Sequence, residues 1–372
     1  MMQEEIISLI ALSEIHGLGP IGIKNLIKVL GSATEVFKNR ENLPDLVPGI
    51  NKRLINALDC PDAFKRAEKE LNFIQKNHIE CISVKEEIYP SRLLECDDAP
   101  AMLFFKGNAN LNTRRIINMV GTRNATDYGK QICNRFINEI KEIDPDILIV
   151  SGLAYGVDIH AHRAALENNL NTVGVLAHGL DRIYPFAHRK TAIEMLASGG
   201  LLTEYISETT PDRQNFIRRN RIVAGMCDAT IVIESAAKGG ALITAEIANS
   251  YNRDCFAFPG RISDEYSAGC NKLIKENKAT LIQSAEDFIK SMCWDTNEIP
   301  AKNSPIQRQL FFDLTEDEEK IINVLQKKGD QQINMLMVNT NIPINKMSAI
   351  LFELEMKGVV RTLAGGMYQL LN

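Results

Sequence analysis

The chain has 372 residues, of which 45% are hydrophobic and 24% are charged, and its formal net charge is −5. This length is typical of two or three domains, and the composition is typical of a globular protein. The net acidity argues mildly against a protein that binds nucleic acid with its whole surface, and it is compatible with a local basic groove.

The apolar runs are shorter than the ~20 residues that a membrane span needs, and residues 1–10 are acidic where a signal peptide is basic. We therefore expect a cytoplasmic protein without membrane contact. The eight cysteines include no CxxC pair, so we expect neither a disulfide framework nor a zinc site. Cys133, Cys227 and Cys255 lie in apolar runs and are interpreted as small core residues.

Residues 1–75 are predicted to form a helical module. Two segments with helical apolar spacing flank the turn Gly17-Leu18-Gly19, a pattern typical of a helix-hairpin-helix (SAM-like) element. A weaker second copy spans 46–58. The glycines suit close approach to a nucleic-acid phosphate, but they suit an ordinary turn between two helices equally well.

Residues 76–291 are predicted to form an α/β core with a Rossmann-like parallel sheet. After two short lead-in strands, near-continuous apolar strands alternate with amphipathic helices from residue 114, which indicates a parallel sheet covered on both faces. The strand ends carry small or polar residues, among them Arg123 and the pair Ser151-Gly152. Because ligands of such sheets bind at the carboxyl ends of the strands, we predict a site there.

A run of arginines gives the strongest indication of what binds at that edge. Arg218, Arg219 and Arg221 are predicted to stand at the start of a helix, where they oppose the helix dipole and an external anion would relieve the repulsion. Phe216 lies one turn earlier. An aromatic ring beside arginines suits single-stranded nucleic acid, because bases stack on the ring while phosphates pair with the cations.

Two further elements fit an anion at the same edge. The turn Gly239-Gly240 opens the next predicted helix, so that its backbone N–H groups can face the ligand. Arg123 follows the first core strand and suits a phosphate. We expect no metal and no cofactor, because the strand exit at 120–129 lacks a dinucleotide-binding glycine pattern and His160 and His162 are spaced poorly for one ion.

Residues 292–314 lack periodicity and are predicted to be a linker. From Thr315 a capping box opens the first of three helices, and a hairpin around Gly365-Gly366 follows, a pattern typical of a winged-helix module over 315–372. From Glu316 onward six Lys and Arg face seven Asp and Glu. That balance is poor for duplex DNA, and we favour a protein-contact role for this module.

In order and spacing, these segments resemble the bacterial DNA-processing protein A (DprA/Smf) family. The resemblance covers residues 80–285 densely, and it rests on the motifs VGTR (120–123), SGLAYGVD (151–158), VLAHGLDRIYP (175–185), LLTEY (201–205), FIRRNRIVAG (216–225), GGALITAEIA (239–248) and FAFPG (256–260). The sequence departs from the family pattern at Ile217, Ala241 and His188.

The resemblance implies a non-enzymatic homodimer that binds single-stranded DNA, protects incoming DNA and loads the RecA recombinase on it during natural transformation. Carried over by motif, the DNA-contacting residues are Arg123, Ser151, Gly152, Phe216, Arg219, Asn220, Arg221 and Gly240; the residue pattern adds Arg218 and Gly239. One alternative stays open: residues 238–246 vaguely resemble the phosphate loop of nucleotide phosphoribohydrolase-like enzymes, with Glu246 as the candidate catalytic carboxylate.

Overall fold

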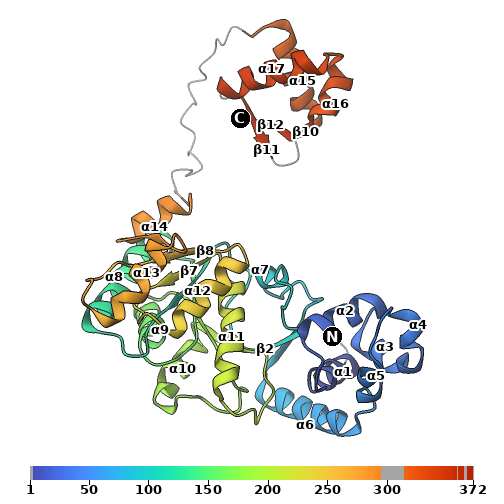
Figure 1. Cartoon of the computed structure of the whole chain (residues 1–372), viewed down its shortest axis with the longest axis vertical. Helices are drawn as coiled ribbons and strands as arrows, with labels where there is room; N and C mark the ends of the chain where they lie inside the picture. The colour runs from blue at the N-terminus through green and yellow to red at the C-terminus, as the bar shows by residue number, and fades with distance from the viewer. Residues whose placement is uncertain (1–2, 295–313, 358, 364–366, 372) are drawn as a thin grey trace. The chain divides into compact units, whose positions relative to one another are not determined.

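The computed structural model describes residues 3–294, 314–357, 359–363 and 367–371 (Figure 1). The chain divides into two compact units, one spanning residues 1–296 and the other residues 297–372. Each unit is described by itself.

A nine-stranded sheet forms the centre of the first unit, with the strand order β1-β2-β6-β5-β4-β3-β7-β8-β9. From β6 to β9 neighbouring strands pair parallel, whereas β2 pairs antiparallel with both β1 and β6. This confirms the predicted Rossmann-like parallel sheet. The strands are β1 Glu80–Ser83, β2 Met102–Gly107, β3 Ile116–Val120, β4 Leu148–Ser151, β5 Thr172–Val175, β6 Gly199–Thr203, β7 Ala229–Val232, β8 Asp254–Ala257 and β9 Thr280–Leu281.

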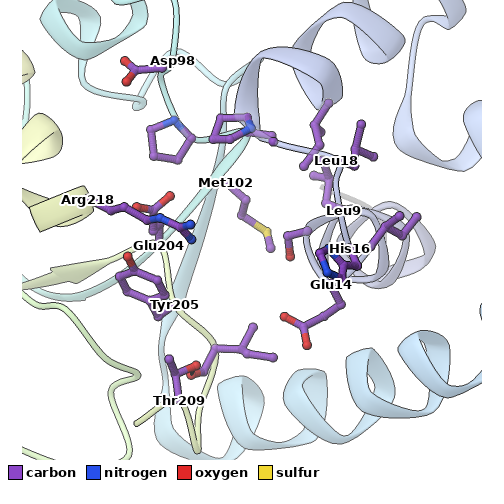
Figure 2. Close-up of a pocket in the computed structure, with 18 of the residues that line it drawn as sticks. Leu9, Glu14, His16, Leu18, Asp98, Met102, Glu204, Tyr205, Thr209 and Arg218 are labelled. Carbon is purple, nitrogen blue, oxygen red and sulfur yellow. Dashed lines mark hydrogen bonds between the residues drawn. The ribbon is translucent and has the colours of Figure 1, made fainter. Parts of the chain in front are cut away.

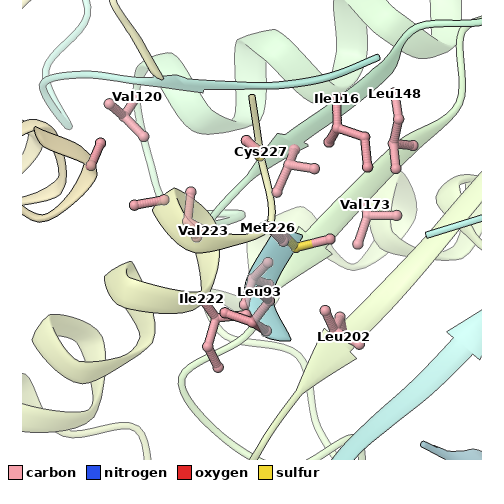
Figure 3. Close-up of a cluster of buried hydrophobic side chains, with 14 of the residues drawn as sticks. Leu93, Ile116, Val120, Leu148, Val173, Leu202, Ile222, Val223, Met226 and Cys227 are labelled. Atoms are coloured by element: carbon pink, nitrogen blue, oxygen red, sulfur yellow. The ribbon is translucent and has the colours of Figure 1, made fainter. Parts of the chain in front are cut away.

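Helices cover both faces of the sheet, and side-chain alternation explains why. In β3, Ile116 and Val120 pack into one apolar cluster together with helix α11, while Ile117 and Met119 pack into another together with α8. Figure 3 shows the first cluster, in which Ile222 and Val223 of α11 lie over the strands. The helices are α7 Ser91–Leu94, α8 Asp127–Ile143, α9 Val157–Glu167, η2 Phe186–His188, α10 Arg189–Met195, α11 Arg213–Gly225, α12 Gly240–Ser250, η3 Glu265–Ser267, α13 Ala268–Lys275 and α14 Ala285–Ser291.

The N-terminal helices pack against the antiparallel margin of the sheet. Their apolar cluster includes Met102 and Phe104 of β2, so the module and the sheet share a core. Gly17, in the turn between the first two helices, has φ +86°, a conformation that favours glycine whether or not the turn meets a phosphate. The elements are α1 Gln3–Ser13, α2 Pro20–Leu30, α3 Ala33–Lys38, η1 Arg40–Asn42, α4 Leu43–Leu46, α5 Lys52–Ala57 and α6 Pro61–Asn77.

The second unit has the predicted winged-helix composition of three helices and a small sheet, in the order β10-β12-β11. The capping box is present, because Thr315 and Glu318 exchange hydrogen bonds at the start of α15. Most of the predicted linker and the Gly365-Gly366 turn lie outside the described residues. The elements are α15 Glu316–Lys328, β10 Gln331–Gln332, α16 Ile333–Thr340, α17 Ile344–Met356, β11 Val360–Leu363 and β12 Met367–Leu370.

Candidate nucleic-acid interface

The predicted site lies where the parallel strands β5, β4, β3 and β7 end side by side, and we call this margin the carboxyl edge. Arg123 follows β3, Ser151 ends β4, and Gly239 and Gly240 follow β7. The sheet order therefore brings together residues that are more than a hundred positions apart in sequence.

Arg123 and Phe216 form the exposed part of the edge. The Arg123 guanidinium carbon lies 5.4 Å from the centre of the Phe216 ring, a distance at which the cation is attracted to the ring. The Phe216 ring centre is in turn 5.9 Å from that of Tyr184. Arg123 is exposed and Phe216 is half-buried, so both can meet a ligand from solvent.

The glycine turn places a helix N-terminus at the same edge. Gly239 caps α12 with extended backbone, and as a glycine it offers the first turn of the helix no side chain. A Cβ on Gly240 would meet nothing within 4 Å, whereas one on Gly239 would lie 2.3 Å from the Ser235 hydroxyl oxygen. The open side of the turn thus presents backbone N–H groups to which an anion can bind.

The structure corrects the sequence-based position of the arginines in α11. The helix begins at Arg213, because the Asp212 side chain accepts a hydrogen bond from the Asn215 N–H at 2.8 Å and caps it. Arg218, Arg219 and Arg221 therefore lie inside the helix. They do not oppose its dipole from the first turn, and the dipole argument for a bound anion does not hold.

Arg219 is buried, with only 4% of its surface exposed. Its Nη2 donates to the Gly152 carbonyl at 3.2 Å, and its Nε has no hydrogen-bond partner among the described residues. Burial lowers the pKa of Arg219 and raises that of the nearby Asp158 carboxyl, while the charge of each offsets the shift of the other. Arg219 thus lies behind the edge as a buried cation.

The Ser151-Gly152 pair is also part of the interior. The Ser151 hydroxyl is fully buried and donates to the Met119 carbonyl at 2.6 Å. A Cβ on Gly152 would lie 1.7 Å from Arg219 Nη1, so glycine is required for this approach. The Ser151 hydroxyl is thus not available to a ligand, and the pair holds the backbone between β4 and α9 in place.

Arg221 and Arg218 face a different region, a cleft of about 830 Å³ between the helical module and the sheet (Figure 2). Arg221 is ion-paired with Glu204 and donates to the Asp98 carbonyl at 2.8 Å. Arg218 is exposed and points into the cleft, while Asn220 between them is half-buried.

The cleft is unlike a groove for a polyanion. Glu14 and His16 enter it from the end of α1, opposite Arg218, as Figure 2 shows. Asp98 and Glu204 line it too, and burial raises the pKa of both the Glu14 and the Glu204 carboxyl. With carboxyl groups on both walls, a phosphate chain is disfavoured here relative to the carboxyl edge.

Two carboxyl groups of the segments before and after the glycine turn have partners within the protein. Glu234, at the end of β7, is buried and accepts hydrogen bonds from the Thr126 hydroxyl at 2.5 Å and the Thr126 N–H at 2.9 Å. Glu246 lies on α12, 3.8 Å from Lys278 in an exposed ion pair. His162 is fully buried, with Nδ1 2.7 Å from the Thr172 hydroxyl oxygen.

Within the part of the chain that the structure describes, no group of His, Cys, Asp and Glu is arranged to hold a metal ion. The same residues include no helix with the length and apolar character of a membrane span. Cys133, Cys227 and Cys255 are buried core residues, which confirms the prediction.

Comparison with known proteins identifies the family. The family model described as DNA recombination-mediator protein A matches residues 80–293, more than half of the chain. The chain belongs to the DprA/Smf family. A second model, the DprA winged helix domain, matches residues 308–366, in agreement with the fold of the second unit.

Relatives in the DprA/Smf family cover much of the chain. DNA processing protein DprA of Bacillus subtilis (strain 168) is 37% identical over 241 residues, which is 64% of this chain and 78% of the relative. Protein Smf of Escherichia coli (strain K12) is 30% identical over 314 residues, 82% of this chain and 81% of the relative.

Two solved DprA structures are similar to this one. DprA from Streptococcus pneumoniae has a TM-score of 0.61 and 31% identity, covering 78% of this chain and 98% of its own. DprA from Helicobacter pylori has a TM-score of 0.52 and 30% identity, covering 58% of this chain and 96% of its own. The latter structure was described for its single-stranded DNA binding mode.

Sequence reasoning missed three residues at the carboxyl edge. Tyr155, Tyr184 and Phe186 are large, exposed aromatic residues on the segments that follow β4 and β5, with Phe186 at the start of η2. A signal was present, since Tyr155 lies four residues after the polar exit of β4, and Tyr184 and Phe186 lie on the segment that follows β5. Exposure of the rings, however, depends on how those loops fold.

Proposed function

We propose that the chain binds single-stranded DNA along the carboxyl edge, protects incoming DNA there and loads the RecA recombinase on it during natural transformation and recombination. The observation that carries this proposal is the exposed Arg123 guanidinium, 5.4 Å from the centre of the Phe216 ring. A cation and an aromatic ring held side by side offer one nucleotide both a phosphate partner and a stacking surface. The binding mode described for the H. pylori relative supports the same ligand class.

The predicted DNA-binding residues have different roles in this proposal. Arg123 and Phe216 contact the strand directly, and the N–H groups at Gly239-Gly240 bind a phosphate at the start of α12. Arg219 raises the local positive potential from behind the edge, since a charge acts through its field without touching the ligand. Ser151 and Gly152 keep the loop after β4 in place.

Arg218, Asn220 and Arg221 belong to a secondary region of the proposed interface. Arg221 already has a carboxylate and a carbonyl partner. We therefore propose that its role is structural and that its ion pair with Glu204 holds α11 in place. Arg218 is exposed and lines the cleft. Its role in the proposal is long-range electrostatic attraction of a polyanion, without a defined contact.

The proposed role is not enzymatic. A nucleotide hydrolase needs a carboxylate free to act at the phosphate loop, whereas Glu234 is bonded to Thr126 and Glu246 lies beside Lys278. We further propose that the protein acts as a cytoplasmic homodimer, with RecA as its protein partner. Membership of the DprA/Smf family supports these last assignments.

The test is the binding of a fluorescent oligothymidine of about 20 nucleotides over a salt series, with wild-type protein and two matched variants. Arg123→Ala removes the exposed cation after β3, and Arg114→Ala removes an exposed arginine at the opposite end of the same strand. We expect Arg123→Ala to weaken binding roughly tenfold and to lower the salt slope by ~0.7, the value for one single-strand phosphate contact. Arg114→Ala leaves both unchanged.

Equal behaviour of the two variants contradicts the proposed site. Absence of wild-type binding at low salt contradicts the ligand class. The protein is then incubated with nucleoside monophosphates; release of free base would favour the hydrolase alternative over the binding role.

A further inference from the structure

Three exposed aromatic side chains lie on the segments that follow β4 and β5, at the same end of the sheet as the proposed DNA contacts. Tyr155 is 49% exposed, Tyr184 49% and Phe186 77%. Tyr155 follows β4, and the other two follow β5. Because β3, β4 and β5 are parallel neighbours, these loops and Arg123 leave the sheet at the same edge. A cluster of exposed rings indicates a binding surface, because so much clustered apolar area is otherwise kept from water.

Contacts connect Tyr184 and the backbone beside Tyr155 to the pair of Phe216 and Arg123, while Phe186 follows Tyr184 by two residues. The Tyr184 ring is 5.9 Å from that of Phe216, at an interplanar angle of 52°. On the other side, a Cβ on Gly156 would lie 2.0 Å from the Thr122 carbonyl oxygen and 2.7 Å from Arg123 Cα. The backbone beside Tyr155 therefore packs directly on the residues that carry the arginine.

Hydrogen bonds and a ring contact within the protein hold the segments that carry these rings in place. The Tyr184 N–H donates to His178 Nε2 at 3.3 Å, and Nδ1 of His178 donates to the Gly179 carbonyl at 2.9 Å. His188 Nδ1 donates to the Leu153 carbonyl at 2.8 Å, and its ring packs 4.8 Å from that of Tyr155. His188 thus links the loop after β5 to the loop after β4. Rings presented on such a fixed backbone lose little conformational entropy when a ligand binds.

The surrounding charge favours a nucleic acid over a protein partner. Residues 181–190 carry three basic side chains (Arg182, Arg189 and Lys190) and one acidic side chain, Asp181. Arg182 pairs with Asp181 at 2.9 Å, while Arg189 is exposed. Aromatic rings interleaved with cations are the combination that single-stranded nucleic acid requires, because every base has a face to stack and every nucleotide has a phosphate to pair.

We infer that Tyr155, Tyr184 and Phe186 extend the Phe216 surface into a stacking platform for successive bases of a single strand. The strand runs across the ends of β7, β3, β4 and β5, a span of about 14 Å at the usual spacing between strands. Since the rings recognise base faces and not base edges, the platform binds without sequence preference. This inference rests on the proposed function, which names the ligand but assigns stacking to Phe216 alone.

The experiment separates stacking from charge by using two ligands of equal length: an oligothymidine of about 20 nucleotides and an abasic oligomer with the same phosphates. The variants are Tyr184→Leu and Phe186→Leu, which keep apolar bulk but remove the aromatic face. Phe186→Trp is the conservative control. Both positions are exposed, so the variants should fold, and thermal melts check this.

We expect each leucine variant to lose roughly tenfold in affinity for oligothymidine, the usual scale for one stacked base. Affinity for the abasic oligomer and the salt slope should stay the same, since no charge is removed. Phe186→Trp should retain binding.

Two outcomes overturn the platform. Either the leucine variants bind oligothymidine as wild type does, or they lose affinity for both oligomers equally. If they change the sedimentation mass while DNA binding is unaffected, the rings form a protein interface instead. Failure of the wild-type protein to bind either oligomer is a different result, because it contradicts the proposed function itself.

Discussion

At the scale of residues, the two arginines Arg123 and Arg219, one at the carboxyl edge and one behind it, have different surroundings. Arg123 is exposed beside Phe216, whereas Arg219 is buried against Gly152 with Asp158 nearby. Substitution of Arg123 should therefore weaken ligand binding and leave the stability of the fold unchanged. Loss of Arg219 should affect folding as well, because it leaves a buried carboxyl group without its neighbouring charge.

Gly152→Ala tests whether the buried arginine organises the loop after β4. The added Cβ would lie 1.7 Å from Arg219 Nη1, so the guanidinium or the loop must shift. We expect the free energy of unfolding to fall by about 1–3 kcal/mol, the usual cost of overpacking, and binding of oligothymidine to weaken with it. Thermal or denaturant unfolding of the purified variant measures the first effect.

Gly240→Ala is the matched control, because a Cβ there meets nothing within 4 Å. It should leave the melting temperature unchanged, while a weaker affinity for DNA would place the strand close to the start of α12. A melting temperature for Gly152→Ala equal to that of wild type would show that the close approach to Arg219 is not required.

At the scale of elements, most of the fold follows from the sequence pattern. The strands β3, β4 and β7 are fully buried, so their sequences are largely apolar and can be recognised as strands. The glycine turn before α12 is recognisable from Gly239-Gly240. The predicted start of α11 is wrong, because the Asp212 side chain that caps the helix lies well before the apolar segment.

Burial of the arginines could not be predicted either. A helical wheel places Arg219 on one face of α11, but it does not show that Gly152, directly after β4, lies against that face. Likewise Arg221 is paired by Glu204, which comes from the end of β6. Whether a cation is free depends on partners that only the three-dimensional fold brings near.

Helix α9 gives a pH-dependent prediction. His162 is fully buried against Thr172 of β5, and burial, with the nearby charges of His188 and Arg219, lowers its pKa from 6.5 to about 3. Between these values the unfolded chain binds a proton that the folded chain excludes, so stability rises with pH. Acidification below pH 6.5 should cost roughly 1.4 kcal/mol per pH unit from this group.

Unfolding curves of wild type and His162→Gln from pH 7 to pH 4.5 measure that contribution. The variant should be less stable at pH 7, and its stability should fall less steeply as the pH is lowered. Parallel pH profiles would mean that His162 titrates normally in the folded chain.

At the scale of the whole molecule, the net charge of −5 and a DNA-binding role are compatible because the proposed interface is local. Basic and aromatic groups gather at the ends of β3, β4 and β5, while the cleft beside the helical module has carboxyl groups on both walls. The second unit has a winged-helix fold with a near-balanced charge, and we continue to favour a protein contact for it over duplex DNA.

The central claim, that single-stranded DNA lies on the carboxyl edge, is tested most directly by photocrosslinking of the full chain. An oligothymidine of about 20 nucleotides carrying 5-iododeoxyuridine is irradiated with the protein, and the crosslinked residues are mapped by mass spectrometry. We predict crosslinks at Phe216 and Tyr184, competed away by unlabelled strand and reduced in Arg123→Ala. Crosslinks confined to the α1–α2 turn or to the winged-helix unit would contradict this account.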